Sequence, residues 1–189
     1  MVRKLSCLAV CLPLLAWAST EVPAPDHFGI GRVVDPETVA RLDIDILPDG
    51  RGLPAGSGSA TEGAAVYAAQ CAACHGAQGE GGSAAALAGG DTDIQALARD
   101  RQATRSVGNY WPYATTLFDY IRRAMPWQAP GSLENNELYA LTAHILALNG
   151  IVSTDHVLDQ NNLANIDMPA RQHYRPVQSA TDLGGSGNE

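Results

Sequence analysis

Two cysteines and a histidine stand together in the pentad Cys71-Ala72-Ala73-Cys74-His75. Two thiols three positions apart on a tightening helix end can reach both vinyl groups of one porphyrin, and the adjacent imidazole then points at the iron. The spacing therefore predicts one covalently bound haem c, attached through Cys71 and Cys74, with His75 as an axial ligand.

Two other uses of this cysteine pair compete with haem attachment. A zinc site needs two further ligands in a second close pair. The remaining histidines are instead scattered along the chain, at His27, His144, His156 and His173. A thioredoxin-like dithiol needs no histidine at this place and is expected in a βαβ context, which the sequence lacks.

A haem that only carries electrons needs a second axial ligand to close the iron to substrates. Met125 and Met168 are the candidates, and each precedes a proline. Met125 lies between two predicted helices, where the chain can return across the haem, and a thioether ligand favours Fe(II) and raises the reduction potential. We predict Met125 as this ligand, with Met168, His144 or an open site as alternatives.

Five further residues are candidates for hydrogen bonds to the haem propionates, because their side chains donate. They are Arg105, Tyr110, Trp111, Arg122 and Arg123. The alternative is a solvated surface position for each arginine and a core contact for each aromatic residue. His144, on the apolar side of the last predicted helix, is expected to be a packed core residue.

Short helices are the elements predicted to position these residues, so the fold class is all-α. The predicted helices cover residues 61–70, 94–99, 115–123 and a last segment that ends at Asn149-Gly150. Their predicted caps are Thr61, Thr92 and Ser132. Helices this few and short make a thin core, and a buried haem would supply the apolar mass that they lack.

The first 18 residues have the features of an export signal. Arg3 and Lys4 precede an apolar run over residues 5–16. That run is shorter than the roughly 20 residues that a membrane-spanning helix needs. The Ala-Trp-Ala sequence at 16–18 fits a cleavage site, so a mature chain that begins at Ser19 is expected in the periplasm, with an uncleaved anchor as the alternative.

Removal of this signal changes the cysteine count and the charge. Only Cys71 and Cys74 remain of the four cysteines, which excludes a framework of structural disulfides. The net charge falls from −8 to about −10 because Arg3 and Lys4 are lost. Nucleic acid is an unsuitable partner for so acidic a chain. No later stretch is long and apolar enough to span a membrane.

Two long arms flank the predicted haem domain, which covers residues 61–150. Residues 19–60 are rich in proline and glycine and read as an extended arm. Residues 151–189 are irregular and polar, and we expect disorder over residues 179–189. A freely diffusing carrier needs only the domain, so the arms are expected to bind a partner, with disordered padding as the alternative.

The helical domain resembles the class I cytochrome c fold. Gly63 and Tyr67 before the cysteine pair, with Leu138 and Tyr139 on the last helix, resemble that fold's contact between first and last helices. Many class I cytochromes have a proline about ten residues after the haem histidine, and its carbonyl accepts the histidine proton. This chain has alanines at the matching positions 84–86.

A narrower resemblance covers nearly the whole mature chain. Three stretches carry it: residues 43–54, the sequence VGNYWPY at 107–113 and the sequence DYIRRAMPW at 119–127. They resemble the SoxD-like cytochrome subunits of the sulfane dehydrogenase SoxCD, and relatives paired with sulfite-oxidase-type molybdenum enzymes. In this resemblance Met125 matches the family's axial methionine.

The resemblance implies an electron-transfer subunit with no catalytic site of its own. In this family the molybdenum subunit oxidises a reduced sulfur compound, and the haem subunit takes up the electrons singly and passes them to another cytochrome. The one attachment motif resembles the monohaem form. The alternative is a freely diffusing periplasmic cytochrome c that feeds a terminal oxidase. A haem enzyme acting on substrate needs an open or cysteine-ligated iron, and no spare cysteine exists.

Overall fold

The computed structural model describes residues 29–90 and 94–174. The predicted export signal, the predicted cap Thr92 and the segment 179–189 lie outside the described residues. Among the described residues, no helix has the length and apolar character needed to cross a bilayer.

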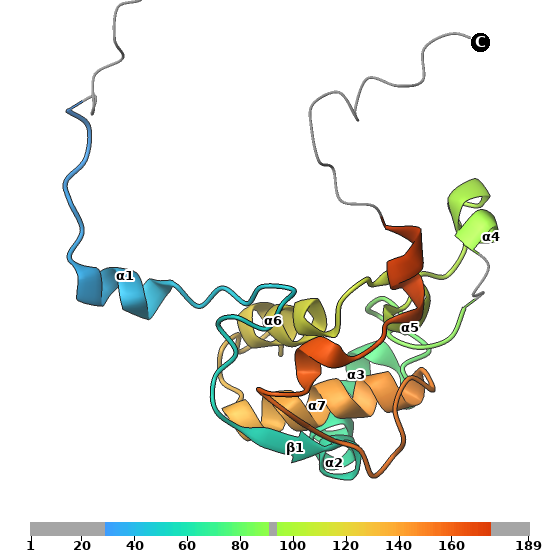
Figure 1. The fold of residues 1–189 in the computed structure, drawn as a ribbon. Coiled ribbons are helices and arrows are strands. Elements are labelled where there is room, and N and C mark those ends of the chain that lie inside the picture. Colours follow the sequence, from blue (N-terminus) through green and yellow to red (C-terminus); the bar gives the residue numbers. More distant parts are fainter. Residues whose placement is uncertain (1–28, 91–93, 175–189) are drawn as a thin grey trace, which may run out of the picture.

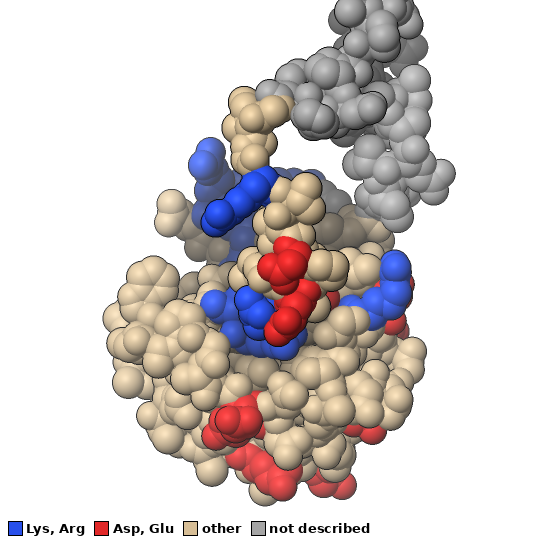
Figure 2. Space-filling view, turned by 90° about the vertical axis from the view of Figure 1, so that its left-hand side faces the viewer, with Lys and Arg blue, Asp and Glu red and all other residues tan. Residues whose placement is uncertain are grey.

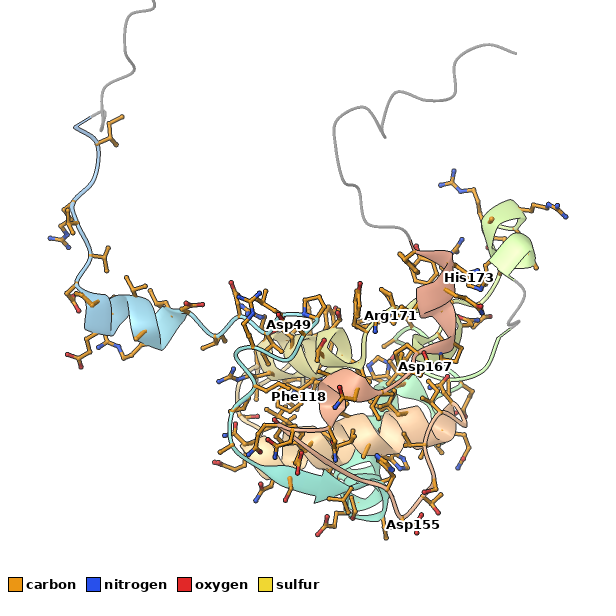
Figure 3. The ribbon with its side chains drawn as sticks, in the orientation of Figure 1. Asp49, Phe118, Asp155, Asp167, Arg171 and His173 are labelled. Atoms are coloured by element: carbon orange, nitrogen blue, oxygen red, sulfur yellow. The ribbon has the colours of Figure 1, made fainter. Side chains whose placement is uncertain are left out.

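Three helices form the centre of the molecule: α2 (Ala60–Gln70), α6 (Ala114–Ala124) and α7 (Asn135–Leu148). Helix α7 lies in contact with both of the others (Figure 1). Phe118 on α6 is fully buried, and its ring lies 4.6 Å from the ring of Tyr139 on α7 (Figure 3). These contacts confirm the predicted all-α architecture.

Shorter elements complete the fold. They are α1 (Pro36–Leu42), β1 (Ser57–Ser59), α3 (Ala72–His75), α4 (Ile94–Arg99), α5 (Val107–Tyr110), β2 (Val157–Asp159) and the 3-10 turns η1 (Leu163–Asn165) and η2 (Pro169–His173). The two strands pair antiparallel, with Gly58 opposite Leu158. This small sheet joins the segment before α2 to the segment after α7.

Two predicted helix caps differ from those in the structure. Helix α2 begins after Ser59, whose hydroxyl accepts from the Glu62 backbone N–H at 3.2 Å, while the Glu62 carboxylate accepts from the Ser59 N–H at 2.7 Å. This reciprocal pair satisfies two free backbone donors, so Ser59 is favoured over Thr61. Helix α7 likewise begins after Glu134 rather than Ser132, because the Glu137 carboxylate accepts from the Glu134 N–H at 2.9 Å.

The crossing of α2 over α7 depends on a glycine. A side chain at Gly63 would collide with the backbone carbonyl of Ala140 and with the His144 side chain. Tyr67, one turn later, packs its ring 5.1 Å from the His144 ring. The first and last helices therefore meet as predicted at Gly63 and Tyr67, but the α7 residues in closest contact are Ala140 and His144.

Of the described residues in the two predicted arms, those at 43–60 and 151–173 belong to the folded body. Ile46 before β1, and Leu158, Leu163 and Met168 after α7, are buried in the same core as the helices. These apolar residues lie in short stretches outside the predicted helices, so helical periodicity did not indicate that they belong to the core. Residues 29–42, including α1, instead extend away from the body (Figure 1).

Replacing Gly63 by alanine tests the helix crossing. Alanine normally stabilises a helix relative to glycine, but here its Cβ forces the two backbones apart. We expect Gly63→Ala to lower the free energy of unfolding by about 1–3 kcal/mol, measured by denaturant titration of the purified protein. The control is Ala65→Ser on the exposed side of α2, and an equally small effect of both changes would contradict the proposed contact.

Candidate functional site

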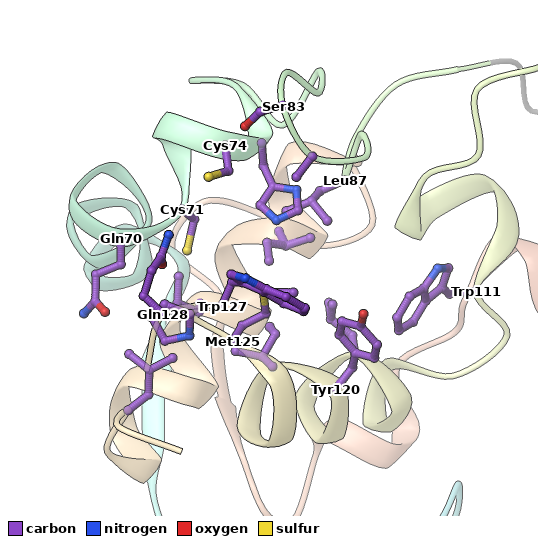
Figure 4. Close-up of a pocket in the computed structure, with 18 residues that line it drawn as sticks. Gln70, Cys71, Cys74, Ser83, Leu87, Trp111, Tyr120, Met125, Trp127 and Gln128 are labelled. Carbon is purple, nitrogen blue, oxygen red and sulfur yellow. The ribbon is translucent and has the colours of Figure 1, made fainter. Parts of the chain in front are cut away.

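A cavity of about 330 Å³ lies between α3, the loop after it, α6 and α7. Its walls are mainly apolar, and no Asp, Glu, Lys or Arg of the described part of the chain lines it. The lining residues include Cys71, Cys74, His75, Leu87, Trp111, Leu117, Tyr120, Ile121, Met125, Trp127, Leu141 and Ile145 (Figure 4). The cavity thus brings together the cysteine pair, the adjacent histidine and one of the two candidate methionines.

The two cysteines lie at one edge of the cavity, where the chain passes from α2 to α3 (Figure 4). Cys71 ends α2 and caps α3, and both thiols are free and half-buried. Burial, assisted by the neighbouring Cys74, raises the pKa of the Cys71 thiol to about 11. The pair therefore faces a shared apolar space at the spacing that two-point attachment of one ligand requires.

The imidazole of His75 is held by the loop that follows it. Its Nδ1 lies 2.7 Å from the carbonyl oxygen of Ala85, which can only accept, so Nδ1 donates and Nε2 keeps its lone pair. The loop returns to α3 through backbone bonds from Ala84 to Cys74 and from Gly81 to His75. An alanine carbonyl thus takes the place that many class I cytochromes give to proline.

The turn after His75 has a second support. Tyr67 is 1% exposed and its hydroxyl donates to the carbonyl of Gly76 at 2.8 Å. Gly76 has φ of +83°, a conformation that suits glycine. Burial of Tyr67 raises its pKa to about 12, so the hydroxyl stays a donor at any ordinary pH. Helix α2 therefore positions both ends of the segment that carries the cysteines and the histidine.

Met125 lies at the end of α6 and lines the cavity, half-buried. Met168, the alternative, is 1% exposed in the core and does not line the cavity. His144 does not line it either, but packs against Tyr67, and burial lowers its pKa. Of the predicted axial candidates, Met125 alone faces the same space as His75.

Most of the residues predicted to contact the propionates do not line the cavity. Trp111 lines the cavity, but Arg105, Tyr110, Arg122 and Arg123 do not. Leu117 and Ile121 turn one side of α6 to the cavity, so Arg122 and Arg123 leave the helix on other sides.

These two arginines bind the segment before β1 instead. Arg122 donates to the Ile44 carbonyl at 3.3 Å. Arg123 pairs with Asp119 at 2.9 Å and also with Asp45. Figure 2 shows basic and acidic side chains next to one another where this segment meets the body. The two arginines therefore fasten the N-terminal segment to the helix that ends at Met125.

Several lining residues were not predicted as site residues. Tyr120 is 49% exposed and lies edge-on to Trp111, with ring centroids 5.7 Å apart. Trp127 is 79% exposed at the rim. Their positions in the sequence could have predicted both residues as part of the site. Tyr120 lies on α6 near its cavity side, and Trp127 follows Met125 by two residues. Gln70 and Gln128 at the rim had no comparable signal.

The residues present fit a haem c. The walls suit the apolar faces of a porphyrin, two thiols stand at one edge, and an imidazole and a thioether come from different elements. Cys71 and Cys74 would attach the group, and His75 and Met125 would bind its iron. Bound in this way, the group supplies one-electron exchange between Fe(III) and Fe(II).

Comparison with known proteins agrees with this site. Residues 58–145 match the family model described as cytochrome c oxidase, cbb3-type, subunit III. The chain is also similar to a chain in the crystal structure of the sulfane dehydrogenase SoxCD from Paracoccus pantotrophus. The two are 36% identical with a TM-score of 0.70, and the match covers 86% of this chain and 80% of that chain. No curated protein matched the sequence.

The fold, the cavity and these matches define a c-type cytochrome domain of class I. Within that class, the chain belongs to the SoxD-like cytochrome c family. The resemblance seen in the three sequence stretches is thereby confirmed. Covalent haem c is the cofactor that the cytochrome c family implies.

Haem attachment can be tested through its covalent bonds. Protein produced with a cytochrome c maturation system should keep its colour after denaturation in acid and organic solvent, because thioether bonds survive this treatment. Mass spectrometry should give the polypeptide plus one haem. Replacing both Cys71 and Cys74 by alanine should remove the bound colour, whereas extractable haem and a bare polypeptide mass in the unchanged protein would contradict the assignment.

Axial ligation can be tested with a matched pair of substitutions of similar volume. Met125→Leu should abolish the weak near-infrared band of sulfur-to-iron charge transfer in the oxidised protein and lower the reduction potential, because a soft ligand to Fe(II) is lost. Met168→Leu should leave both unchanged and alter the free energy of unfolding by less than about 1.5 kcal/mol. The reverse pattern would assign the ligand to Met168.

Proposed function

We propose that this protein is a monohaem electron-transfer subunit of a periplasmic, sulfur-oxidising molybdenum dehydrogenase. It accepts electrons singly from the molybdenum subunit and passes them to another cytochrome. The single observation that carries the proposal is the match to a chain of SoxCD, which extends over 86% of this chain and so well beyond the haem domain. The export signal expected at residues 1–18 supports the periplasmic location.

The exposed N-terminal segment at residues 29–42 favours a function in a stable complex with a partner. Ile30 is 92% exposed, Val33 is 99% exposed and Leu42 is 73% exposed. Helix α1 has its own cap, since Asp35 accepts from the Thr38 N–H at 2.8 Å, but its seven residues are too few to be stable alone. Apolar side chains on an extended segment of this kind are typical of a surface that is covered in a complex.

The surface that the arms leave free for a partner is smaller than the two arms that the sequence predicted to bind one. Ile46 and Leu53, which lie in the N-terminal arm predicted to bind a partner, pack into the protein's own core. The segment 151–173 also covers the helices. We therefore place the main contact with the molybdenum subunit on residues 29–42, next to the segment that Arg122 and Arg123 fasten to α6.

The alternative function is that of a freely diffusing periplasmic cytochrome c that feeds a terminal oxidase. The matched family model, which is named for an oxidase subunit, favours this alternative, but it covers only residues 58–145. A free carrier has no use for an exposed apolar segment outside that range. The two functions therefore differ in what residues 29–42 do.

Deleting residues 19–42 from the mature chain distinguishes these functions. The deletion leaves Ile44, Asp45 and the core in place, so haem binding and the absorption spectrum should be unchanged. Association with the molybdenum subunit, measured by size-exclusion chromatography, should fall at least tenfold, and substrate-driven haem reduction should slow with it.

A matched control keeps the segment but removes its apolar side chains. Val33→Ser combined with Leu42→Ser should reproduce the loss of association, whereas Arg32→Gln, a neighbouring polar change, should not. If the shortened protein binds and is reduced as well as the full mature chain, the segment is padding and the free carrier is the better description.

A further inference from the structure

Four arginines lie at the end of the molecule opposite α1 (Figure 1): Arg99 ends α4, Arg101 and Arg105 follow it in the chain, and Arg171 lies in η2, which contacts α5. We call this group the arginine corner, and it consists of Arg99, Arg101, Arg105 and Arg171. All four are exposed. It holds a large share of the basic residues of a chain whose net charge is −8.

The arginine corner differs from the other arginines in its pairing. Arg41, Arg51 and Arg123 each form an ion pair with a carboxylate. Within the described part of the chain, no residue of the arginine corner has such a partner. Asp100 lies between Arg99 and Arg101 in the chain, and its carboxylate accepts from the Gln102 backbone N–H at 2.8 Å and keeps its negative charge. The four guanidiniums of the corner outnumber this carboxylate, and all four arginines are exposed to solvent.

Aromatic rings hold part of this charge in place. The Arg105 guanidinium lies 5.5 Å from the Tyr110 ring centre and donates to the Leu97 carbonyl at 2.9 Å. Arg171 lies 5.0 Å from the Tyr113 ring centre (Figure 3). Such cation–π contacts fix long side chains without neutralising them. Two of the four guanidiniums, those of Arg105 and Arg171, are thus held in place without a carboxylate partner among the described residues.

The arginine corner also adjoins the wall of the haem cavity. Trp111 directly follows Tyr110 in the chain and lines the cavity. Figure 4 shows Trp111 and Tyr120 on the side of the cavity away from Cys71 and Cys74. A partner seated on the corner would approach the cavity closely, as electron transfer requires, without touching residues 29–42.

We propose that the arginine corner is the docking face for the electron acceptor, a one-electron redox protein with an acidic surface around its own redox centre. The inference rests on the proposed electron-transfer function. One electron leaves this protein, which is oxidised, and reduces the acceptor by one unit, and no bond is made or broken.

Charge decides the kind of partner. The net negative charge of the chain repels an acidic protein. The four guanidiniums of the corner attract it at one place, so they determine both the orientation in which it binds and the rate at which it associates. The overall negative charge disfavours nucleic acid and anionic membranes. With the donor held at the α1 end, the two partners can bind at the same time.

Small inorganic oxidants of opposite charge test the local field on the intact haem-loaded protein. The reduced protein is mixed with anionic hexacyanoferrate(III) in a stopped-flow instrument, with salt raised from 0.01 M to 0.15 M so that the Debye length falls from about 30 Å to about 8 Å. The rate constant should fall as salt rises, because salt screens the attraction between the arginine corner and the anion. If the net negative charge of the protein decided the rate, salt would raise it instead.

The double variant Arg99→Gln/Arg101→Gln should slow this reaction about three- to tenfold at low salt and little at high salt. Neither side chain makes a contact that holds the fold, so the reduction potential should stay unchanged. The matched control Arg41→Gln/Arg51→Gln removes the same charge elsewhere and should have no effect. With cationic tris(phenanthroline)cobalt(III), the corner variant should not slow the reaction.

Two results would overturn the docking face: a rate with hexacyanoferrate that rises with salt in the unchanged protein, or equal slowing by the two double variants. Neither measurement involves the molybdenum subunit. If the hexacyanoferrate experiment contradicts the docking face, the proposed function is therefore unaffected. If the protein does not bind the molybdenum subunit or accept electrons from it, the proposed function fails, but the measured field at the arginine corner is unaffected.

Discussion

The structure depends on a cavity that the polypeptide surrounds but does not fill with its own side chains. Helices α3, α6 and α7 and the loop after α3 each turn apolar or metal-binding residues toward it. The walls of this cavity are mainly apolar side chains, which gain stability when a ligand removes them from water, at roughly 25 cal/mol per Å² of apolar surface. A haem bound there would bury these walls, so the cofactor and the fold are mutually dependent.

Two contacts away from the cavity fix its shape. Gly63 lets α2 lie directly against α7, which sets the position of Cys71 at the end of α2. Asn149 at the end of α7 accepts from the Gly108 N–H at 3.1 Å and donates to the Leu87 carbonyl at 2.9 Å. This one side chain joins the end of α7 to α5 and to the loop that holds His75.

The sequence predicted the site better than its surroundings. The cysteines and His75 are adjacent in the chain, so local spacing was enough to place them together. Met125 was predicted from its position between two helices, and the structure brings it to the same cavity. The contacts of Arg122 and Arg123 could not be predicted, because their partners Ile44 and Asp45 are 78 residues away along the chain.

The packing of the arms shows the same limit. Leu158 and Met168 lie in a mostly polar part of the sequence, and no helical period indicates that they are buried. Leu158 is buried in β2, which pairs with the distant strand β1, and Met168 lies between η1, which contacts α6, and η2, which contacts α5. The structure also shows what residues 107–113, one of the three stretches that carry the family resemblance, do in the fold. Val107 and Asn109 are buried in the protein, and Trp111 lines the cavity.

The most direct test of the account is nuclear Overhauser spectroscopy of the reduced, haem-loaded protein. A haem bound in this cavity should give close contacts from its protons to the Met125 methyl group on one side, and to Leu141 and Trp111 around the ring. These residues come from three separate elements, so one spectrum tests the whole cavity. Contacts from the haem to Met168 or His144 instead would contradict the account.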